Sequence, residues 1–134
     1  VVKGNDVSFS GMLTAAIKLA PTHKMADVCY SLQETSFAML AEAVERALSF
    51  TGKKEMMIVG GVSANRRLAQ MLEMACKRQQ SRFFACPIKY AGDNGAQIAL
   101  TAILDYRKTK NSVKIPDAFA VQSWRLDTVD VAWR

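Results

Sequence analysis

The feature that most constrains the fold is a strand-to-helix junction in the middle of the chain. A short apolar run, Met56-Met57-Ile58-Val59, is followed by Gly60-Gly61-Val62-Ser63-Ala64-Asn65 and then by strong helix formers from Arg66 to Met74. A bounded apolar run predicts a buried strand, and a small polar residue before a helix-forming run predicts a helix start. A related junction, Asp93-Asn94-Gly95-Ala96, precedes a second helix-forming run. The chain is therefore predicted to alternate strands and helices.

The longest expected helix carries an apolar stripe at three- and four-residue spacing, which predicts one buried face. A Gly52 stop and two lysines follow it, as is typical of a helix end. Strands that alternate with helices indicate an α/β fold with at least two parallel strands. The expected segments are extended chain at Val1–Ser10, helices at Gly11–Leu19, Met25–Phe50, Asn65–Gln79 and Asn94–Lys108, strands at Met56–Val59 and Arg82–Ala85, and extended chain at Val121–Leu126.

Both junctions are candidates for ligand binding. Gly60 and Gly61 would let backbone N–H groups approach an anion, and the start of the following helix adds a partial positive charge. The alternative is that the pair of glycines forms only a tight turn. Asp93 also has two interpretations, an N-cap or a metal ligand. An aspartate before a helix is ordinarily an N-cap, and a metal site needs three or more ligand groups. On the residues alone, Asp93 is predicted to be a cap.

The composition and the cysteines limit the class of protein. At 134 residues and 50% apolar content, the chain is expected to form one core and one domain. It has three cysteines without CxxC spacing, and Cys29 and Cys76 lie in apolar helical contexts, so we expect reduced core thiols. No apolar stretch is long enough to span a bilayer, and the N-terminus lacks a secretory pattern. We expect a soluble cytosolic protein that does not act at a membrane.

The net charge of +6 indicates a polyanionic partner such as RNA, with solvated helix faces as the alternative. The excess lies in two clusters. The first comprises Arg66, Arg67, Lys77, Arg78, Arg82 and Lys89, and the second comprises Arg107, Lys108, Lys110 and Lys114. Within the span of the first cluster, the sequence has only one acidic residue, Glu73. The lone His23, in a loop after Pro21, is expected to be inert.

Several segments together resemble the Kae/TsaD family of tRNA threonylcarbamoyladenosine synthases, once called O-sialoglycoprotein endopeptidases. They occur in the family's order along nearly the whole chain. The closing residues and Thr51-Gly52-Lys53-Lys54-Glu55 resemble the archaeal and eukaryotic branch. The matching segments are Asp6 to Ile17 with its Ser-Phe-Ser-Gly core, Tyr30-Ser31-Leu32-Gln33-Glu34-Thr35, Gly60–Asn65, Asp93-Asn94-Gly95-Ala96 and Arg125–Arg134.

The resemblance implies the actin-like ATPase (ASKHA) architecture, two ribonuclease-H-like lobes around a nucleotide cleft. Residues 1–134 would be a single C-terminal lobe, with a partly irregular tail from about residue 109, incomplete without the N-terminal lobe. Asn65, with backbone access at Gly60 and Gly61, would contact the nucleoside of threonylcarbamoyl-AMP. Asp93 would be one ligand of a divalent metal, iron or zinc. The remaining ligands, an His-x-x-x-His motif of the N-terminal lobe, are absent from this sequence.

The implied activity is transfer of the threonylcarbamoyl group from threonylcarbamoyl-AMP to the adenosine beside the tRNA anticodon. This chain alone is expected to be inactive. The expected partners are tRNA, threonylcarbamoyl-AMP or an ATP-like nucleotide, and KEOPS-type subunits including a small kinase, in the cytoplasm and also the nucleus. Two alternatives stay open: a non-catalytic module that docks tRNA or a partner protein, and a lobe of another ASKHA-type kinase.

Overall fold

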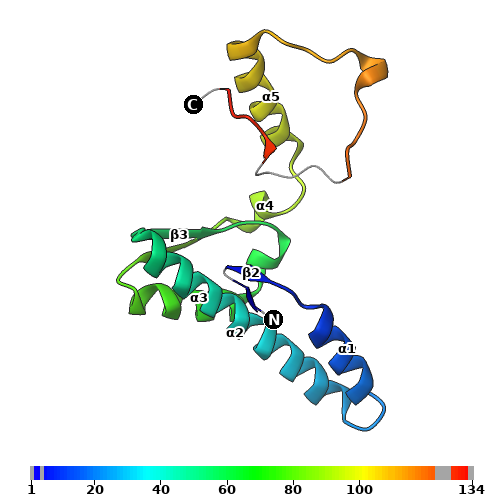
Figure 1. Ribbon diagram of the computed structural model, residues 1–134, viewed down its shortest axis with the longest axis vertical. Helices are drawn as coiled ribbons and strands as arrows, with labels where there is room; N and C mark the ends of the chain where they lie inside the picture. The colour runs from blue at the N-terminus through cyan, green and yellow to red at the C-terminus, as the bar shows by residue number, and fades with distance from the viewer. Residues whose placement is uncertain (1, 4, 123–127, 133–134) are drawn as a thin grey trace. The chain divides into compact units, whose positions relative to one another are not determined.

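The computed structural model describes residues 2–3, 5–122 and 128–132 of the chain. These residues form two compact units, Val1–Gly92 and Asp93–Arg134, each described by itself. In chain order the elements are β1 (Val2–Lys3), β2 (Asp6–Val7), α1 (Ser10–Leu19), α2 (Met25–Thr51), β3 (Glu55–Ile58), the 3-10 turn η1 (Gly61–Ala64), α3 (Arg66–Arg78), β4 (Arg82–Ala85), α4 (Ile88–Ala91), α5 (Gly95–Thr109) and the 3-10 turn η2 (Ile115–Asp117) (Figure 1).

The centre of the first unit is a parallel pair of strands joined through a helix. β3 and β4 pair with Glu55 opposite Arg82 and Ile58 opposite Ala85, and α3 is the crossover between them. Parallel strands need such a crossover because the chain must return to the same end of the sheet before it continues. The prediction of at least two parallel strands in an α/β fold is therefore confirmed.

The core lies between one face of this sheet and the helices α2 and α3. Phe37 of α2 packs with Leu68 and Leu72 of α3, and all three are buried. Met56 and Ile58 of β3 pack against this cluster, together with Phe83 of β4. Successive strand residues point to opposite faces, so Met57 lies on the other face, where it is exposed.

The long helix α2 confirms the predicted amphipathic helix and its stop signal. It ends at Thr51, and Gly52 follows in the left-handed conformation with φ of 65°. That conformation strongly favours glycine, which explains why the helix ends at this point.

Before α2, the antiparallel pair β1–β2 leads into α1, which contacts α2. Among the described residues, no helix is both long and apolar enough to cross a membrane.

The second unit contains α5 and the irregular segment after it. Asn94 caps the start of α5, and Lys110 ends the helix in the left-handed conformation. The turn η2 contains Pro116. The extended segment predicted at Val121–Leu126 and the family-like closing stretch from Arg125 lie largely outside the described residues.

Two details of the sequence interpretation are wrong. The sequence interpretation placed no helix between the strand at Arg82–Ala85 and the helix at Asn94–Lys108, but this stretch contains the short helix α4, whose Ala91 is buried. Cys29 is exposed on α2 because it lies off the face that packs against the core, so it is not a core thiol. Cys76 is fully buried, and burial raises the pKa of its thiol, in agreement with the expected reduced core cysteine.

Candidate functional site

Asn65 fixes the start of α3 with its side chain. Its Oδ1 atom accepts hydrogen bonds from the backbone N–H of Arg67 at 2.9 Å and of Leu68 at 3.2 Å. These N–H groups have no partner within the helix, so the amide side chain satisfies donors that would otherwise need water or a ligand. Asn65 is therefore the N-cap of α3, and only its Nδ2 group is available for other contacts.

The two glycines before the cap have different backbone conformations. Gly60 has φ of 88° and ψ of 168°, a region that is essentially restricted to glycine. Gly61 opens η1 with an ordinary φ, and a Cβ atom at either glycine would meet nothing within 4 Å. Within the described residues, the N–H groups of Gly61 and Val62 have no hydrogen-bond partner. The junction therefore presents two free backbone donors beside the start of a helix.

Ser63 was not singled out by the sequence interpretation, although it lies between the glycines and the cap. Its side chain is 6% exposed, and its Oγ atom has no hydrogen-bond partner among the described residues. A buried hydroxyl without a partner is uncommon in folded proteins. No sequence signal separates this serine from an ordinary turn residue, because its burial depends on the elements that pack around η1.

Two neighbouring side chains of α2 reach the start of α3. Glu34 and Arg67 form a bidentate ion pair, in which Nε lies 2.8 Å from Oε1 and Nη2 lies 2.7 Å from Oε2. The Arg67 hydrogen bonds hold the pKa of the Glu34 carboxyl below its usual value, and the same contact raises the pKa of Arg67. Gln33 Oε1 accepts a long hydrogen bond of 3.5 Å from Asn65 Nδ2. The signal for these residues was the family-like run from Tyr30 to Thr35, which carried no assigned role.

Asp93 does not cap α5, contrary to the expectation from the residues alone. Asn94 performs that role, since its Oδ1 accepts from the N–H of Ala96 at 3.0 Å and of Gln97 at 3.3 Å. The residue whose side chain points back to the first turn is the one directly before the helix, and α5 begins at Gly95. The Asp93 carboxylate is exposed, and no hydrogen bond or ion pair to it is present in the described residues.

The described residues do not by themselves form a metal centre. Across residues 2–3, 5–122 and 128–132, no group of three or more His, Cys, Asp or Glu side chains is placed to hold a metal ion. Asp93 could supply one oxygen ligand, whereas protein sites for iron or zinc usually need three or more protein ligands. The donor set of the described residues therefore does not fit a complete iron or zinc site.

Four of the six residues of the first basic cluster form ion pairs, three of them with acidic residues from other elements. Arg67 pairs with Glu34, Arg78 with Glu45 at 3.4 Å and Arg82 with Glu55. Lys77 pairs with Glu73, the neighbour seen in the sequence, at 3.0 Å. Within the described part of the chain, Arg66 and Lys89 have no ion-pair partner. A count of neighbouring charges in the sequence therefore overstated the free positive charge of this cluster.

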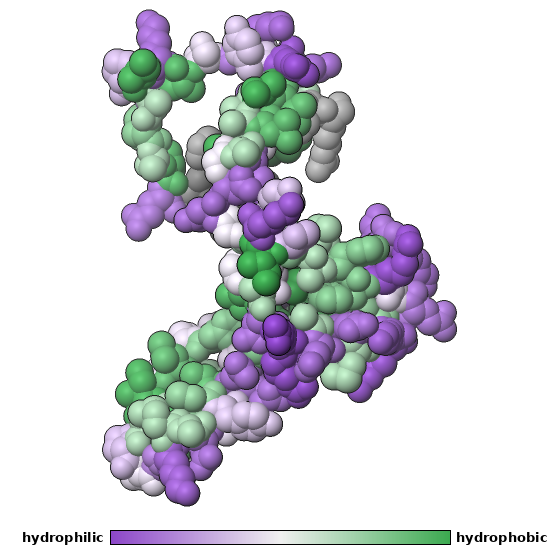
Figure 2. Space-filling model, turned by 180° about the vertical axis from the view of Figure 1, so that it is seen from behind, coloured by the Kyte–Doolittle hydropathy of each residue, from purple (hydrophilic) through white to green (hydrophobic). Residues whose placement is uncertain are grey.

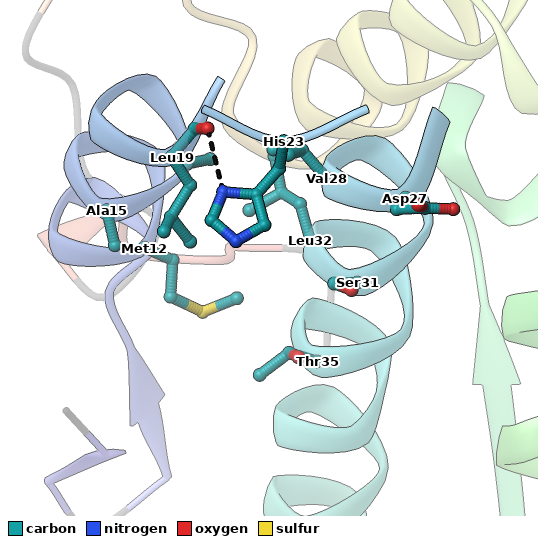
Figure 3. A pocket seen from close by; sticks show the side chains of 10 residues that line it. Met12, Ala15, Leu19, His23, Asp27, Val28, Ser31, Leu32 and Thr35 are labelled. Atoms are coloured by element: carbon teal, nitrogen blue, oxygen red, sulfur yellow. Dashed lines mark hydrogen bonds between the residues drawn. The ribbon is translucent and has the colours of Figure 1, made fainter. Parts of the chain in front are cut away.

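A pocket of about 260 Å³ lies between α1 and α2, away from the junction residues (Figure 3). Its lining is mainly apolar, with Met12, Leu19 and Leu32 among the side chains. His23 points into it, and its Nδ1 atom lies 3.2 Å from the carbonyl oxygen of Leu19. The pocket contains neither glycine of the junction, nor Asn65 or Asp93, so it is separate from the candidate site.

The structure thus brings Gly60, Gly61 and Asn65 together at one turn, while Asp93 belongs to the second unit. Free N–H groups at the start of a helix bind phosphate or carboxylate oxygens, because the helix dipole favours negative charge there. This geometry defines the chain as an α/β protein with two free backbone donors at a strand-to-helix turn. Residues 1–100 match the family model described as tRNA N6-adenosine threonylcarbamoyltransferase. The chain belongs to this family.

Archaeal relatives align along nearly the whole chain. One from Methanococcus vannielii, named a probable bifunctional tRNA threonylcarbamoyladenosine biosynthesis protein, is 51% identical over 98% of this chain and 24% of its own length. The tRNA N6-adenosine threonylcarbamoyltransferases of Methanocella arvoryzae and Saccharolobus islandicus are each 46% identical, over 99% and 100% of this chain. The chain covers 41% and 40% of those two relatives. It therefore spans less than half the length of each.

Proposed function

We propose that this chain is the C-terminal lobe of an actin-like transferase that forms threonylcarbamoyladenosine in tRNA. The observation that carries the proposal is the family match over residues 1–100, which includes the Gly60–Asn65 junction with its free donors. Family membership also argues against the alternative of a sugar or acetate kinase lobe. The chain would supply one wall of a nucleotide site, and a second lobe would supply the other.

The proposed reaction transfers an acyl group from a mixed anhydride to an amine. The exocyclic amine of the tRNA adenosine attacks the carbonyl carbon of threonylcarbamoyl-AMP, the bond from that carbon to the phosphate oxygen breaks, and AMP leaves as the amine loses a proton. The N–H groups of Gly61 and Val62 would hold a phosphate or carbamate oxygen and stabilise the charge that grows on it. Asn65 Nδ2 would contact the nucleoside and orient the donor.

We propose Asp93 as one ligand of a divalent iron or zinc ion whose other ligands come from the second lobe. Its exposed carboxylate supports this role, because Asn94 rather than Asp93 caps α5. Metal content of the two-lobed protein tests the proposal. Asp93→Asn should lower the bound metal, whereas Asp105→Asn, further along α5, should leave it unchanged. Equal metal in both variants would refute the assignment.

Exposed apolar side chains support the proposal that this chain works inside a larger protein. Leu13 and Ile17 on α1 are exposed, as are Met57 of β3 and Val59 directly after that strand. Figure 2 shows apolar residues gathered over the α1 end of the first unit. Large exposed apolar areas are typical of surfaces that another chain or domain covers. We propose that a second lobe and KEOPS-type subunits, including a small kinase, cover them in the cytoplasm and nucleus.

The ion pairs bear on which basic residues are free to contact tRNA. Arg67, Lys77 and Arg78 are paired, so Arg66 is the residue of the α3 group that retains a free charge in the described chain. Arg107 and Lys108 near the end of α5 also have no ion-pair partner among the described residues. Unpaired cations attract phosphates more strongly than neutralised ones. We propose that these residues, rather than Lys77 and Arg78, contact tRNA phosphates.

The experiment that tests the proposed function is transfer of labelled threonylcarbamoyl from threonylcarbamoyl-AMP to tRNA by the two-lobed protein. The expected product is modified tRNA together with AMP. If the protein binds tRNA tightly but neither binds AMP nor forms product, the chain belongs instead to a docking module. That second function is the one the net charge of +6 would favour.

A further inference from the structure

Two ion pairs connect α2 to α3, and they occupy equivalent places along the two helices. Glu34–Arg67 and Glu45–Arg78 each join residues that are 33 positions apart. The helices therefore run side by side in the same direction, and the second pair lies eleven residues further along both of them. The two pairs differ in what surrounds them. One is at the start of α3 beside the candidate site, and the other is at the end.

The pair beside the site is much better formed. Glu34 is 22% exposed and Arg67 is 41% exposed, and three hydrogen bonds of 2.7–3.1 Å join them. In the distal pair, Arg78 is 74% exposed and one contact of 3.4 Å joins it to Glu45. A bidentate, partly buried pair holds its two side chains in one orientation, whereas a single exposed contact does so weakly. The proximal pair can therefore fix the start of α3 against α2.

The same segment of α2 also reaches the side chain proposed to bind ligand. Asn65 Oδ1 is used in capping the N–H groups of Arg67 and Leu68, and Asn65 Nδ2 faces Gln33 Oε1. The cap, the ion pair and the Gln33 contact form one connected set around the first turn of α3. A change in Glu34 would release Arg67, whose backbone N–H is one of the two groups that hold Asn65.

We propose that Glu34 and Gln33 are positioning residues that orient Asn65 and the first turn of α3 for the nucleotide. The inference rests on the proposed function in one respect, namely that the junction binds the AMP part of the donor. Neither residue needs to touch the nucleotide. Their contribution is to keep the Asn65 amide and the free N–H groups of the turn in one arrangement, so that binding does not have to order them.

The test compares Glu34→Gln with Glu45→Gln in the two-lobed protein. Both variants remove the charge of one α2–α3 ion pair, and Glu45→Gln controls for the loss of such a pair away from the candidate site. We expect Glu34→Gln to weaken AMP binding by about five- to tenfold in calorimetry, and Glu45→Gln to change it less than about twofold. Hydrogen exchange at the N–H groups of Arg67 and Leu68 should be faster in the first variant only.

A charge exchange provides the rescue. Glu34→Arg together with Arg67→Glu re-forms a pair between the same positions, and AMP affinity should recover to within about threefold of wild type. Equal AMP affinity in Glu34→Gln, Glu45→Gln and wild type would overturn the proposal. If the variants show the expected differences in AMP binding but the wild-type protein transfers nothing to tRNA, the proposed function fails and the positioning role stands. If wild type does not bind AMP, both are overturned.

Discussion

Substitution of each glycine of the junction by alanine separates a folding requirement from a binding requirement. Gly60 has φ of 88° and ψ of 168°, so Gly60→Ala forces an L-residue into a region that glycine alone occupies readily. A Cβ at this position would meet nothing within 4 Å, so backbone strain is the whole cost. We expect the free energy of unfolding to fall by about 1–3 kcal/mol.

Gly61 gives the contrasting case at the next position. Its φ is ordinary and a Cβ would lie in open space, so alanine is expected to keep stability or raise it by up to about 1 kcal/mol. The added methyl group stands beside the free N–H groups of Gly61 and Val62, where it narrows the approach of an anion. Gly61→Ala should therefore weaken AMP binding in a protein that folds as well as wild type.

Urea unfolding and AMP calorimetry on the two-lobed protein measure the two effects separately. Gly11→Ala, near the start of α1, is a matched control because a Cβ there also meets nothing within 4 Å. The control should keep both stability and AMP affinity. Two results would refute the reasoning: a Gly60→Ala variant as stable as wild type, or a stable Gly61→Ala variant with unchanged AMP affinity.

Two further predictions concern the contacts around the first turn of α3. Asn65→Ala removes the cap and should lower the free energy of unfolding by about 1 kcal/mol. Asn65→Asp keeps an accepting oxygen, so it should retain most of the stability while it loses the Nδ2 contact with the nucleoside. Urea unfolding and AMP calorimetry check both variants. Because Arg67 lowers the folded-state pKa of Glu34 below the unfolded value of about 4.5, the pair stabilises the protein above that pH and its contribution disappears as the pH falls through the folded-state pKa. The difference in thermal unfolding between wild type and Glu34→Gln should therefore shrink on acidification, and a constant difference would contradict the assignment.

The local elements were predictable because their signals lie within a few residues. The apolar run before Gly60, the helix start at about Asn65 and the stop at Gly52 each act over one turn, and the structure confirms all three. Asp93 and Asn94 show the limit of this reasoning. Both are common cap residues, and a shift of one position in the helix start decides which of them caps and which remains free for a ligand.

The partners of the basic residues could not be predicted from the sequence. Arg67 and Arg78 meet Glu34 and Glu45 only after α2 and α3 pack side by side, and each pair spans 33 positions. Arg82 meets Glu55 only through the pairing of β3 with β4. Helix packing and strand register arise from the whole core, so local charge counts miss these contacts. For the same reason Gln33 and Glu34 stood out as a motif without a role.

The most direct test of the account measures threonylcarbamoyl transfer to tRNA by the isolated chain and by the two-lobed protein, side by side. The chain supplies one wall of the site, so the account predicts labelled tRNA from the two-lobed protein and none above background from the chain alone. Asn65→Asp in the two-lobed protein should fold normally and lose most of the transfer. Transfer by the isolated chain, or full transfer by the Asn65→Asp variant, would contradict the account.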